Sequence, residues 1–362
     1  MKSNYKRLGD YIRQVDVRNR DLAVGNLLGL SISKQFIPSI ANTIGTDMAN
    51  YKIVQPRQFG YVPVTSRNGD KITVALYDGN KPCIISQAYI VFEVTDKDKL
   101  LPEYLMMWFR RPEFDRYARF KSHGSAREVF EWDEMCEVML PVPSIEDQRK
   151  IVTEYQAVEQ RIENNRRLIA TLEDAAQTIY RKMFVDNIDP NNLPQGWRMG
   201  KIGDLFTLQR GHDLPSQYRK PGDFPIYAST GINGYHNEYR VKAPCVVTGR
   251  SGSIGVVNYV TTSFWPLNTT LFVKECDNSS MEFAFFKLKE LELDKLVAGY
   301  AAVPTLNRND VHMIKSVIAP QAYIKDFSSK ISPLFISINR VNKEITILEQ
   351  TLSILLTKLS NL

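Results

Sequence analysis

Apolar residues recur with a 4-3-4-3 spacing in two long stretches of the chain. The first stretch runs Ile151, Tyr155, Val158, Ile162, Asn165, Ile169, Leu172, Ala176, Ile179 and Met183, and only Asn165 is polar. The second runs Phe327, Ile331, Leu334, Ile338, Val341, Ile345, Leu348, Leu352, Leu355 and Leu359. A period of about 3.5 residues predicts the seam of a coiled coil. Two amphipathic helices packed on their own domains would favour a wider stripe with a period of about 3.6.

Each seam predicts a long helix. Ser144 is a suitable N-cap for the first helix, with Asp147 at the capping-box position. The segment from Ile151 to Met183 would extend about 50 Å at about 1.5 Å per residue. Pro333 would either kink the second helix or mark the start of its regular part. As a polar seam residue, Asn165 is expected to fix the register at some cost in stability.

The segments outside the helices repeat weakly but in a preserved order. The Gly-Asp pair at residues 9–10 recurs at 203–204, within "RLGDYI" and "KIGDLF". Residues 64–73 resemble 247–256, which aligns Arg67 with Arg250, and residues 130–143 resemble 307–320, which aligns Asp133 with Asp310. Three matches in the same order predict that the chain builds one unit twice, with longer loops in the first half.

Each repeat consists of a globular lobe followed by a helix. Runs at 83–94 and 264–275 predict strands, and runs at 101–114 and 281–293 predict helices, which indicates α+β lobes. The predicted domains are residues 1–143, helix 144–188, residues 189–320 and helix 321–362. The second helix can pair along the first only by running back antiparallel. We therefore expect two similar α/β lobes separated by a long antiparallel two-helix coiled coil, with pseudo-two-fold symmetry.

Composition narrows the class of protein. The chain has 362 residues, 46 basic and 40 acidic side chains and a net charge of +6 spread over both halves, which permits an anionic partner without requiring one. The four cysteines are scattered, as expected for free thiols in a reducing compartment. The N-terminus has no apolar signal region and no apolar run is long enough to span a membrane, so we expect a cytoplasmic protein.

Familiar catalytic patterns do not occur in the sequence. It contains no G-x-G-x-x-G, no Walker loop, no HExxH and no G-x-S-x-G. The glycine-rich segment "GRSGSIG" at 249–255 is best interpreted as a turn between two strands, although such a turn can bring backbone amides to a phosphate. We therefore expect a protein that binds rather than catalyses, with no metal or cofactor of its own.

Two lobes joined by long helices would suit duplex DNA with two separated half-sites. Side chains in the predicted turns are of the types that contact phosphates and base edges. The candidates in the first lobe are Arg18, Arg20, Arg57, Arg67, Asn68, Lys71, Lys121, Ser125 and Arg127. Those in the second lobe are Arg210, Tyr218, Arg219, Lys220, Ser229, Asn233, Arg250, Ser253, Asn268 and Thr269.

The whole chain resembles the specificity subunit of type I restriction-modification systems. The motifs that carry the resemblance are "RLGDYI", "LPQGWRMGKIGDLF", the lobe exit "LPVPSIEDQRKIV", the helix end "LEDAAQTIYRKMF" and "VVTGRSGSIGVVNYV…FWPLNTTLFV". The second lobe exit, "IAPQAYIKDF", departs from the pattern because it lacks the Asp147-Gln148 pair of the first.

The resemblance implies a DNA-binding subunit that reads a bipartite, asymmetric target with one half-site per lobe. It also implies two partner methylation subunits, which bind S-adenosylmethionine and methylate adenine, and restriction subunits that use ATP and Mg²⁺ for translocation and cleavage. This chain would supply sequence choice and no catalysis.

Other interpretations stay open from the sequence. The chain could serve a methylation-only or a single-chain restriction-methylation system. It could be a nuclease with a site among acidic residues such as Asp204 and Asp213. It could also be a coiled-coil scaffold that binds no nucleic acid.

Overall fold

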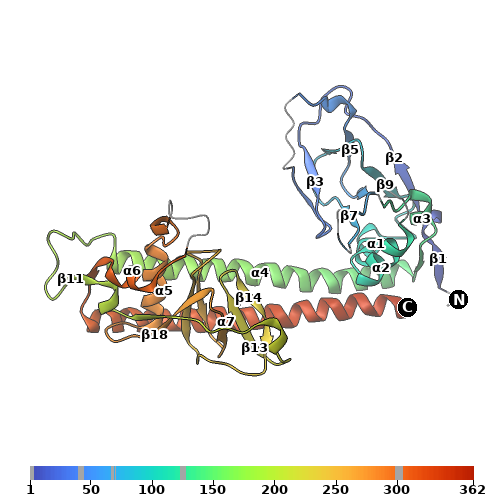
Figure 1. The fold of residues 1–362 in the computed structure, drawn as a ribbon. Coiled ribbons are helices and arrows are strands. Elements are labelled where there is room, and N and C mark those ends of the chain that lie inside the picture. The colour runs from blue at the N-terminus through green and yellow to red at the C-terminus, as the bar shows by residue number, and fades with distance from the viewer. Residues whose placement is uncertain (1–3, 40–44, 67–68, 70, 123–127, 298–304) are drawn as a thin grey trace. The chain divides into compact units, whose positions relative to one another are not determined.

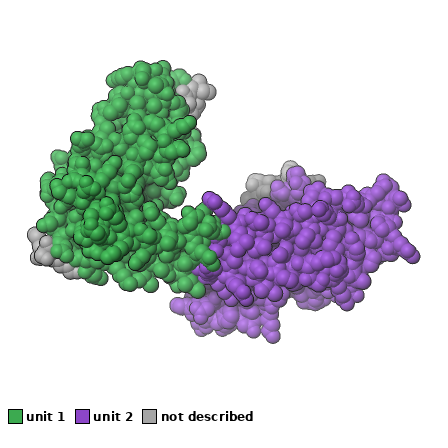
Figure 2. All heavy atoms as spheres, turned by 180° about the vertical axis from the view of Figure 1, so that it is seen from behind, with its two compact units in different colours: residues 1–164, 345–362 green, residues 165–344 purple. Residues whose placement is uncertain are grey.

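The computed structural model describes the chain except for residues 1–3, 40–44, 67–68, 70, 123–127 and 298–304. The chain divides into two compact units, one of residues 1–164 with 345–362 and one of residues 165–344 (Figure 2). Each unit combines one lobe with parts of two long helices. Among the described residues, no helix combines the length and apolarity that crossing a membrane requires.

The two long helices are α4 (Ile145–Phe184) and α7 (Gln321–Lys358) (Figure 1). The predicted cap of α4 is present: the Ser144 hydroxyl accepts a hydrogen bond from the Asp147 amide at 3.2 Å and donates one to the Asp147 carboxylate at 2.7 Å. This satisfies an amide that the first helical turn leaves without a partner. Helix α7 continues through Pro333, so its regular part begins before the proline.

The helices run antiparallel within each unit. In the first unit, Val152 and Tyr155 from the start of α4 share an apolar cluster with Leu356 near the end of α7. In the second unit, Tyr180 from the end of α4 clusters with Phe327 near the start of α7. Every predicted seam position, including the polar Asn165, is buried or half-buried. The compact units cut across the predicted domains because antiparallel pairing joins the start of one helix to the end of the other.

An antiparallel four-stranded sheet forms the centre of the first lobe. Its strands, in order across the sheet, are β2 (Ile12–Val15), β9 (Ile90–Val94), β6 (Phe59–Val62) and β7 (Thr73–Leu76). The smaller pairs are β1 (Tyr5–Arg7) with β10 (Met139–Pro141), β3 (Leu28–Leu30) with β4 (Phe36–Pro38), and β5 (Lys52–Val54) with β8 (Cys83–Ile85). The helices are α1 (Pro102–Phe109), α2 (Pro112–Lys121) and α3 (Trp132–Cys136), with 3₁₀ turns at Leu8–Asp10 and Met48–Asn50.

The second lobe has a main sheet of the same kind. Its strands, in order, are β12 (Thr207–Arg210), β18 (Thr270–Glu275), β15 (Cys245–Gly249) and β16 (Val257–Val260). Strand β11 (Arg198–Lys201) pairs with β19 (Lys315–Ile318), and β13 (Phe224–Ala228) lies between β14 (Gly231–His236) and β17 (Trp265–Pro266). The helices are α5 (Met281–Glu290) and α6 (Arg308–Met313), with 3₁₀ turns at Ile202–Asp204, Ser216–Tyr218 and Lys295–Val297; a further one, Leu359–Asn361, follows α7 in the first unit.

The predicted repeat corresponds to equivalent elements. Both Gly-Asp pairs end a 3₁₀ turn that follows the opening strand of the lobe, β1 or β11. That strand pairs antiparallel with the last strand before a long helix, β10 or β19. The main sheets have the same strand order once equivalent strands are matched. The fold class is therefore α+β, with two similar lobes and a long antiparallel helix pair.

Several boundaries differ from the sequence expectations. The predicted strand 83–94 is two strands, β8 and β9, separated by a turn in which the Tyr89 amide bonds the Ser86 carbonyl. The strand 264–275 likewise divides into β17 and β18. The helix 101–114 divides into α1 and α2, because Pro112 has no amide to continue α1 and starts the next helix. The helix 281–293 ends at Glu290.

The connection between β6 and β7, residues 63–72, is longer than the connection between β15 and β16, residues 250–256. Arg67, which the sequence aligns with Arg250, lies outside the described residues.

Candidate nucleic-acid interface

Most of the described cations predicted in the first lobe are held by carboxylates. The three ion pairs join Arg18 Nε to Asp16 Oδ1 at 2.9 Å, Arg57 Nη2 to Glu103 Oε2 at 2.7 Å, and Lys121 Nζ to Glu134 Oε2 at 3.2 Å. The Arg18 guanidinium lowers the pKa of the Asp16 carboxyl. These side chains carry little net charge toward solvent.

Arg20 and Lys71 are the exposed exceptions in that lobe. Arg20 donates a 2.7 Å hydrogen bond to the Asn50 side-chain oxygen, and Arg18 donates to the Asn50 carbonyl at 2.8 Å, so Asn50 holds both arginines in one place. Lys71 makes no ion pair with any residue that the structure describes. Four further candidates, Arg67, Asn68, Ser125 and Arg127, lie outside the described residues.

The turn between β15 and β16 brings several candidates of the second lobe together. A Cβ at Gly249 would lie 1.9 Å from the Ser253 carbonyl oxygen, so this tight turn requires glycine. The Arg250 amide donates to the Thr269 carbonyl at 2.8 Å, and its own carbonyl accepts from the Leu306 amide at 2.8 Å. The segment "GRSGSIG" is therefore the predicted turn between strands, and its backbone fixes the position of Arg250.

Beside this turn lies a polar cleft of about 450 Å³, lined by Arg210, Arg250, Leu271, Thr305, Asn307 and Arg308. Arg210 ends β12, and Arg308 begins α6. None of the three arginines forms an ion pair or side-chain hydrogen bond with a described residue. Burial, and then the charge of Arg210, lower the pKa of Arg250. We call Arg210, Arg250 and Arg308 the arginine cleft.

His312 holds the two walls of the arginine cleft together. Its Nε2 accepts a 2.8 Å hydrogen bond from the amide of Leu208, two residues before Arg210. Burial, and then the nearby charge of Arg308, lower the pKa of His312. The imidazole is therefore neutral near pH 7 and can accept this bond. Sequence reasoning missed Arg308, although it lies in the repeated segment 307–320.

A second group of candidates lies around the β13–β14 hairpin. Arg219 Nη1 donates to the Asn233 carbonyl at 3.0 Å and to its side-chain oxygen at 2.9 Å, which joins the segment after the Ser216–Tyr218 turn to β14. Tyr218 is 65% exposed, and Tyr235 on β14 is 56% exposed. Lys220 is exposed, and its amide donates to His236 Nδ1 at 3.0 Å. Tyr235 was missed in the sequence because its environment depends on strand pairing.

The four remaining candidates of the second lobe lie within the fold or contact other residues. Ser229 is buried, 8% exposed, beside the β15–β16 turn. Asn268 donates a hydrogen bond to Asp213, and the Thr269 hydroxyl is buried without a hydrogen-bond partner among the described residues. Ser253 is half-buried within the turn. The structure thus places Arg250, Ser253, Ser229 and Thr269 around one turn.

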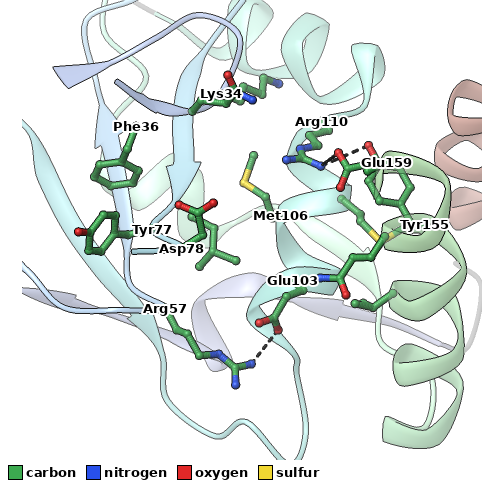
Figure 3. Close-up of a pocket in the computed structure, with 15 residues that line it drawn as sticks. Lys34, Phe36, Arg57, Tyr77, Asp78, Glu103, Met106, Arg110, Tyr155 and Glu159 are labelled. Atoms are coloured by element: carbon green, nitrogen blue, oxygen red, sulfur yellow. Dashed lines mark hydrogen bonds and ion pairs between the residues drawn. The ribbon is translucent and has the colours of Figure 1, made fainter. Parts of the chain in front are cut away.

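The first unit contains a larger cavity of about 560 Å³ between the lobe and the start of α4 (Figure 3). Its charged walls are internally paired: Arg110 Nη1 lies 2.5 Å from Glu159 Oε1 on α4, and Arg57 bonds Glu103. Lys34 pairs with Asp115 at 2.7 Å, and burial lowers the pKa of the lysine. The Arg110–Glu159 pair fastens the lobe to α4, whereas the other two pairs lie within the lobe. Asp78 also lines the cavity and has no ion pair with a described residue.

Metal chemistry has no visible support in the described part of the chain. No group of three or more His, Cys, Asp or Glu side chains lies close enough there to hold an ion. The arrangement offers arginines, hydroxyls, amides and exposed tyrosines instead. These groups bind anions and hydrogen-bonding surfaces such as nucleic acid.

Comparison with known proteins identifies the family of the chain. The profile of the type I restriction modification DNA specificity domain matches residues 39–174 and 194–340. The MjaIX type I restriction enzyme specificity subunit of Methanocaldococcus jannaschii is 24% identical over 302 residues, covering 74% of this chain and 70% of the relative. A crystal structure of the type I restriction-modification S subunit from M. genitalium aligns with a TM-score of 0.65 and 16% identity, covering 98% of this chain and 95% of the other.

The duplicated lobes with antiparallel helices define a protein of the DNA-specificity class. The chain belongs to the type I restriction-modification specificity subunit family, because the domain profile matches most of its length and does so twice.

Proposed function

We propose that this chain is the sequence-specific DNA-binding subunit of a type I restriction-modification complex. It reads a bipartite, asymmetric duplex target, with one half-site contacted by each lobe. It directs adenine methylation by two partner methylation subunits and cleavage by partner restriction subunits. The chain itself carries out no catalysis, and it acts in the cytoplasm.

The observation that carries this proposal is the duplication of one lobe with different surfaces. Both lobes contain the same four-stranded sheet order and the same opening and closing strand pair. Their connecting loops differ in length and composition, with ten residues and three charged side chains at 63–72 and seven residues and one charged side chain at 250–256. Two copies of a scaffold with different loops suit two half-sites of different sequence.

The long helices would set the distance between the two half-sites. Removing one heptad from both helices shortens each by about 10 Å at about 1.5 Å per residue. That length corresponds to about three base pairs at about 3.4 Å per pair. The expected result is a target with a shorter unread gap, or loss of activity when the partner subunits no longer fit.

The chemistry of the complex would lie on the partner subunits. S-adenosylmethionine would supply the methyl group on the methylation subunits, and ATP with Mg²⁺ would serve the restriction subunits. Target adenines are inaccessible inside a duplex and must be extruded for methylation. This chain would position those subunits over the two half-sites while it holds distorted DNA.

Methylome sequencing of the host, with and without this gene, tests the proposal. The expected result is loss of methylation at one bipartite adenine motif in the deletion strain, restored by complementation. Exchanging residues 190–320 for those of a relative with another target should change only one half-site. An unchanged methylome in a strain whose partner subunits are active would contradict the proposal.

A further inference from the structure

The arginine cleft in the second lobe has a charge that a base edge cannot neutralise. Arg210, Arg250 and Arg308 line one cleft of about 450 Å³, and none has an acidic partner among the described residues. Guanine presents two neutral acceptors to an arginine, whereas a phosphodiester carries a full negative charge that several arginines can share. The uncompensated charge therefore favours phosphate over a base edge.

The cleft is also built to keep its position. Backbone hydrogen bonds on both sides of Arg250 fix the turn that carries it, and the bridge between Ser251 and Thr305 closes the same wall. The His312–Leu208 hydrogen bond holds α6 against β12, so Arg308 and Arg210 face a common space. A preorganised set of donors loses less entropy when an anion binds.

We propose that Arg210, Arg250 and Arg308 clamp a backbone phosphate of the DNA bound to the second lobe and read no base. This inference rests on the proposed DNA-binding function. The contact positions the second lobe on its half-site without contributing to sequence choice.

The test uses the full chain and fluorescence anisotropy with labelled duplexes, at salt concentrations from about 50 to 200 mM. The variant R210A/R308A removes two exposed arginines and leaves Arg250 and its half-buried turn unchanged. We expect it to weaken binding about tenfold or more on every duplex tested. We also expect the slope of log affinity against log salt to become shallower by about one, the value for one lost phosphate contact.

A matched control is Lys274→Ala. Lys274 is an exposed cation on β18 that pairs with Glu275 at 2.8 Å, so its removal changes net charge without touching the cleft. It should alter neither the affinity nor the salt slope appreciably.

The variant R250K keeps the positive charge but loses the planar guanidinium group that can hold a phosphate with two hydrogen bonds. Its affinity should therefore fall in part, and on every duplex tested.

Each outcome separates the hypotheses. If the wild-type chain binds duplex DNA and R210A/R308A matches it, the phosphate clamp is wrong while the proposed function stands. If the variant loses affinity for one sequence only, with an unchanged salt slope, the arginines read bases. If inorganic phosphate occupies the cleft and duplex DNA does not displace it, the ligand is free phosphate. Failure of the wild-type chain to bind any duplex overturns the proposed function itself.

Discussion

Tyr180 should be the most important single side chain for the stability of the second unit. The residue lies near the end of α4 and is fully buried. Its ring centroid lies 5.3–5.9 Å from those of four phenylalanines, Phe184, Phe283, Phe286 and Phe327, which come from α4, α5 and α7. One ring therefore joins both long helices to the lobe.

The cost of removing this ring follows from its burial. A tyrosine buries about 150–250 Å², which at about 25 cal/mol per Å² corresponds to roughly 4–6 kcal/mol as an upper bound. We therefore expect Tyr180→Ala to lower the free energy of unfolding by about 3–5 kcal/mol. The hydroxyl group of Tyr180 contributes less to the free energy of unfolding than the ring. Burial raises the pKa of Tyr180, so the hydroxyl stays protonated and donates a hydrogen bond to Glu290.

Tyr180→Phe isolates that hydrogen bond. Glu290 still lies 3.2 Å from the Lys287 ammonium and is one-third exposed, so water can replace the lost donor. The expected loss is about 1 kcal/mol. Urea denaturation, monitored by tryptophan fluorescence, measures the free energy of unfolding of both variants. Trp197 reports on this cluster because its ring centroid lies 6.1 Å from that of Phe184. Hydrogen exchange should localise the loss to the second unit.

The matched control is Tyr218→Ala, the same substitution at a 65% exposed tyrosine of the same lobe. It should change the free energy of unfolding by less than about 0.5 kcal/mol. If Tyr180→Phe destabilises as much as Tyr180→Ala, the hydrogen bond and not the ring holds the cluster together. A Tyr180→Ala variant within about 1 kcal/mol of the wild type would refute the packing argument altogether.

Three further predictions concern buried polar groups. The folded state lowers the pKa of His312, so the unfolded chain binds a proton there more readily, and the contribution of His312 to stability should be lost as pH falls below its ordinary pKa of about 6.5. The variant His312→Gln keeps a hydrogen-bond acceptor for the Leu208 amide and should flatten the pH dependence of urea unfolding. An unchanged pH profile would contradict this. Asn165 is 4% exposed, and its side-chain amide nitrogen has no hydrogen-bond partner among the described residues. Asn165→Leu should therefore raise the free energy of unfolding by about 1–3 kcal/mol. A lower thermal midpoint than that of the wild type would show that the amide is hydrogen-bonded or holds the helix register. Cys245 is 1% exposed, and burial raises its pKa to about 12, so its thiol should react with Ellman's reagent only on unfolding; rapid labelling of Cys245 in the native chain would disprove it.

The sequence could predict the features that depend on local periodicity. The heptad spacing identified both long helices, and each predicted seam position is buried or half-buried. The repeated Gly-Asp turns identified the two lobe openings, because such a turn is encoded by adjacent residues. Two strands and one helix were predicted as single elements although turns and Pro112 divide them, since an apolar run shows no difference between one strand and two.

The candidate interface depended much more on the tertiary structure. From the sequence, every arginine in a predicted loop is a candidate for binding DNA. In the structure, carboxylates neutralise Arg18 and Arg57. Arg210 and Arg250 have no acidic partner among the described residues. Arg308 joins Arg210 only because α6 packs on β12 through a histidine. The sequence by itself therefore determined the long helices, the duplication and the family. Only the tertiary structure decided which charges stay unpaired, because ion pairing depends on strand register and on contacts between residues far apart in the chain.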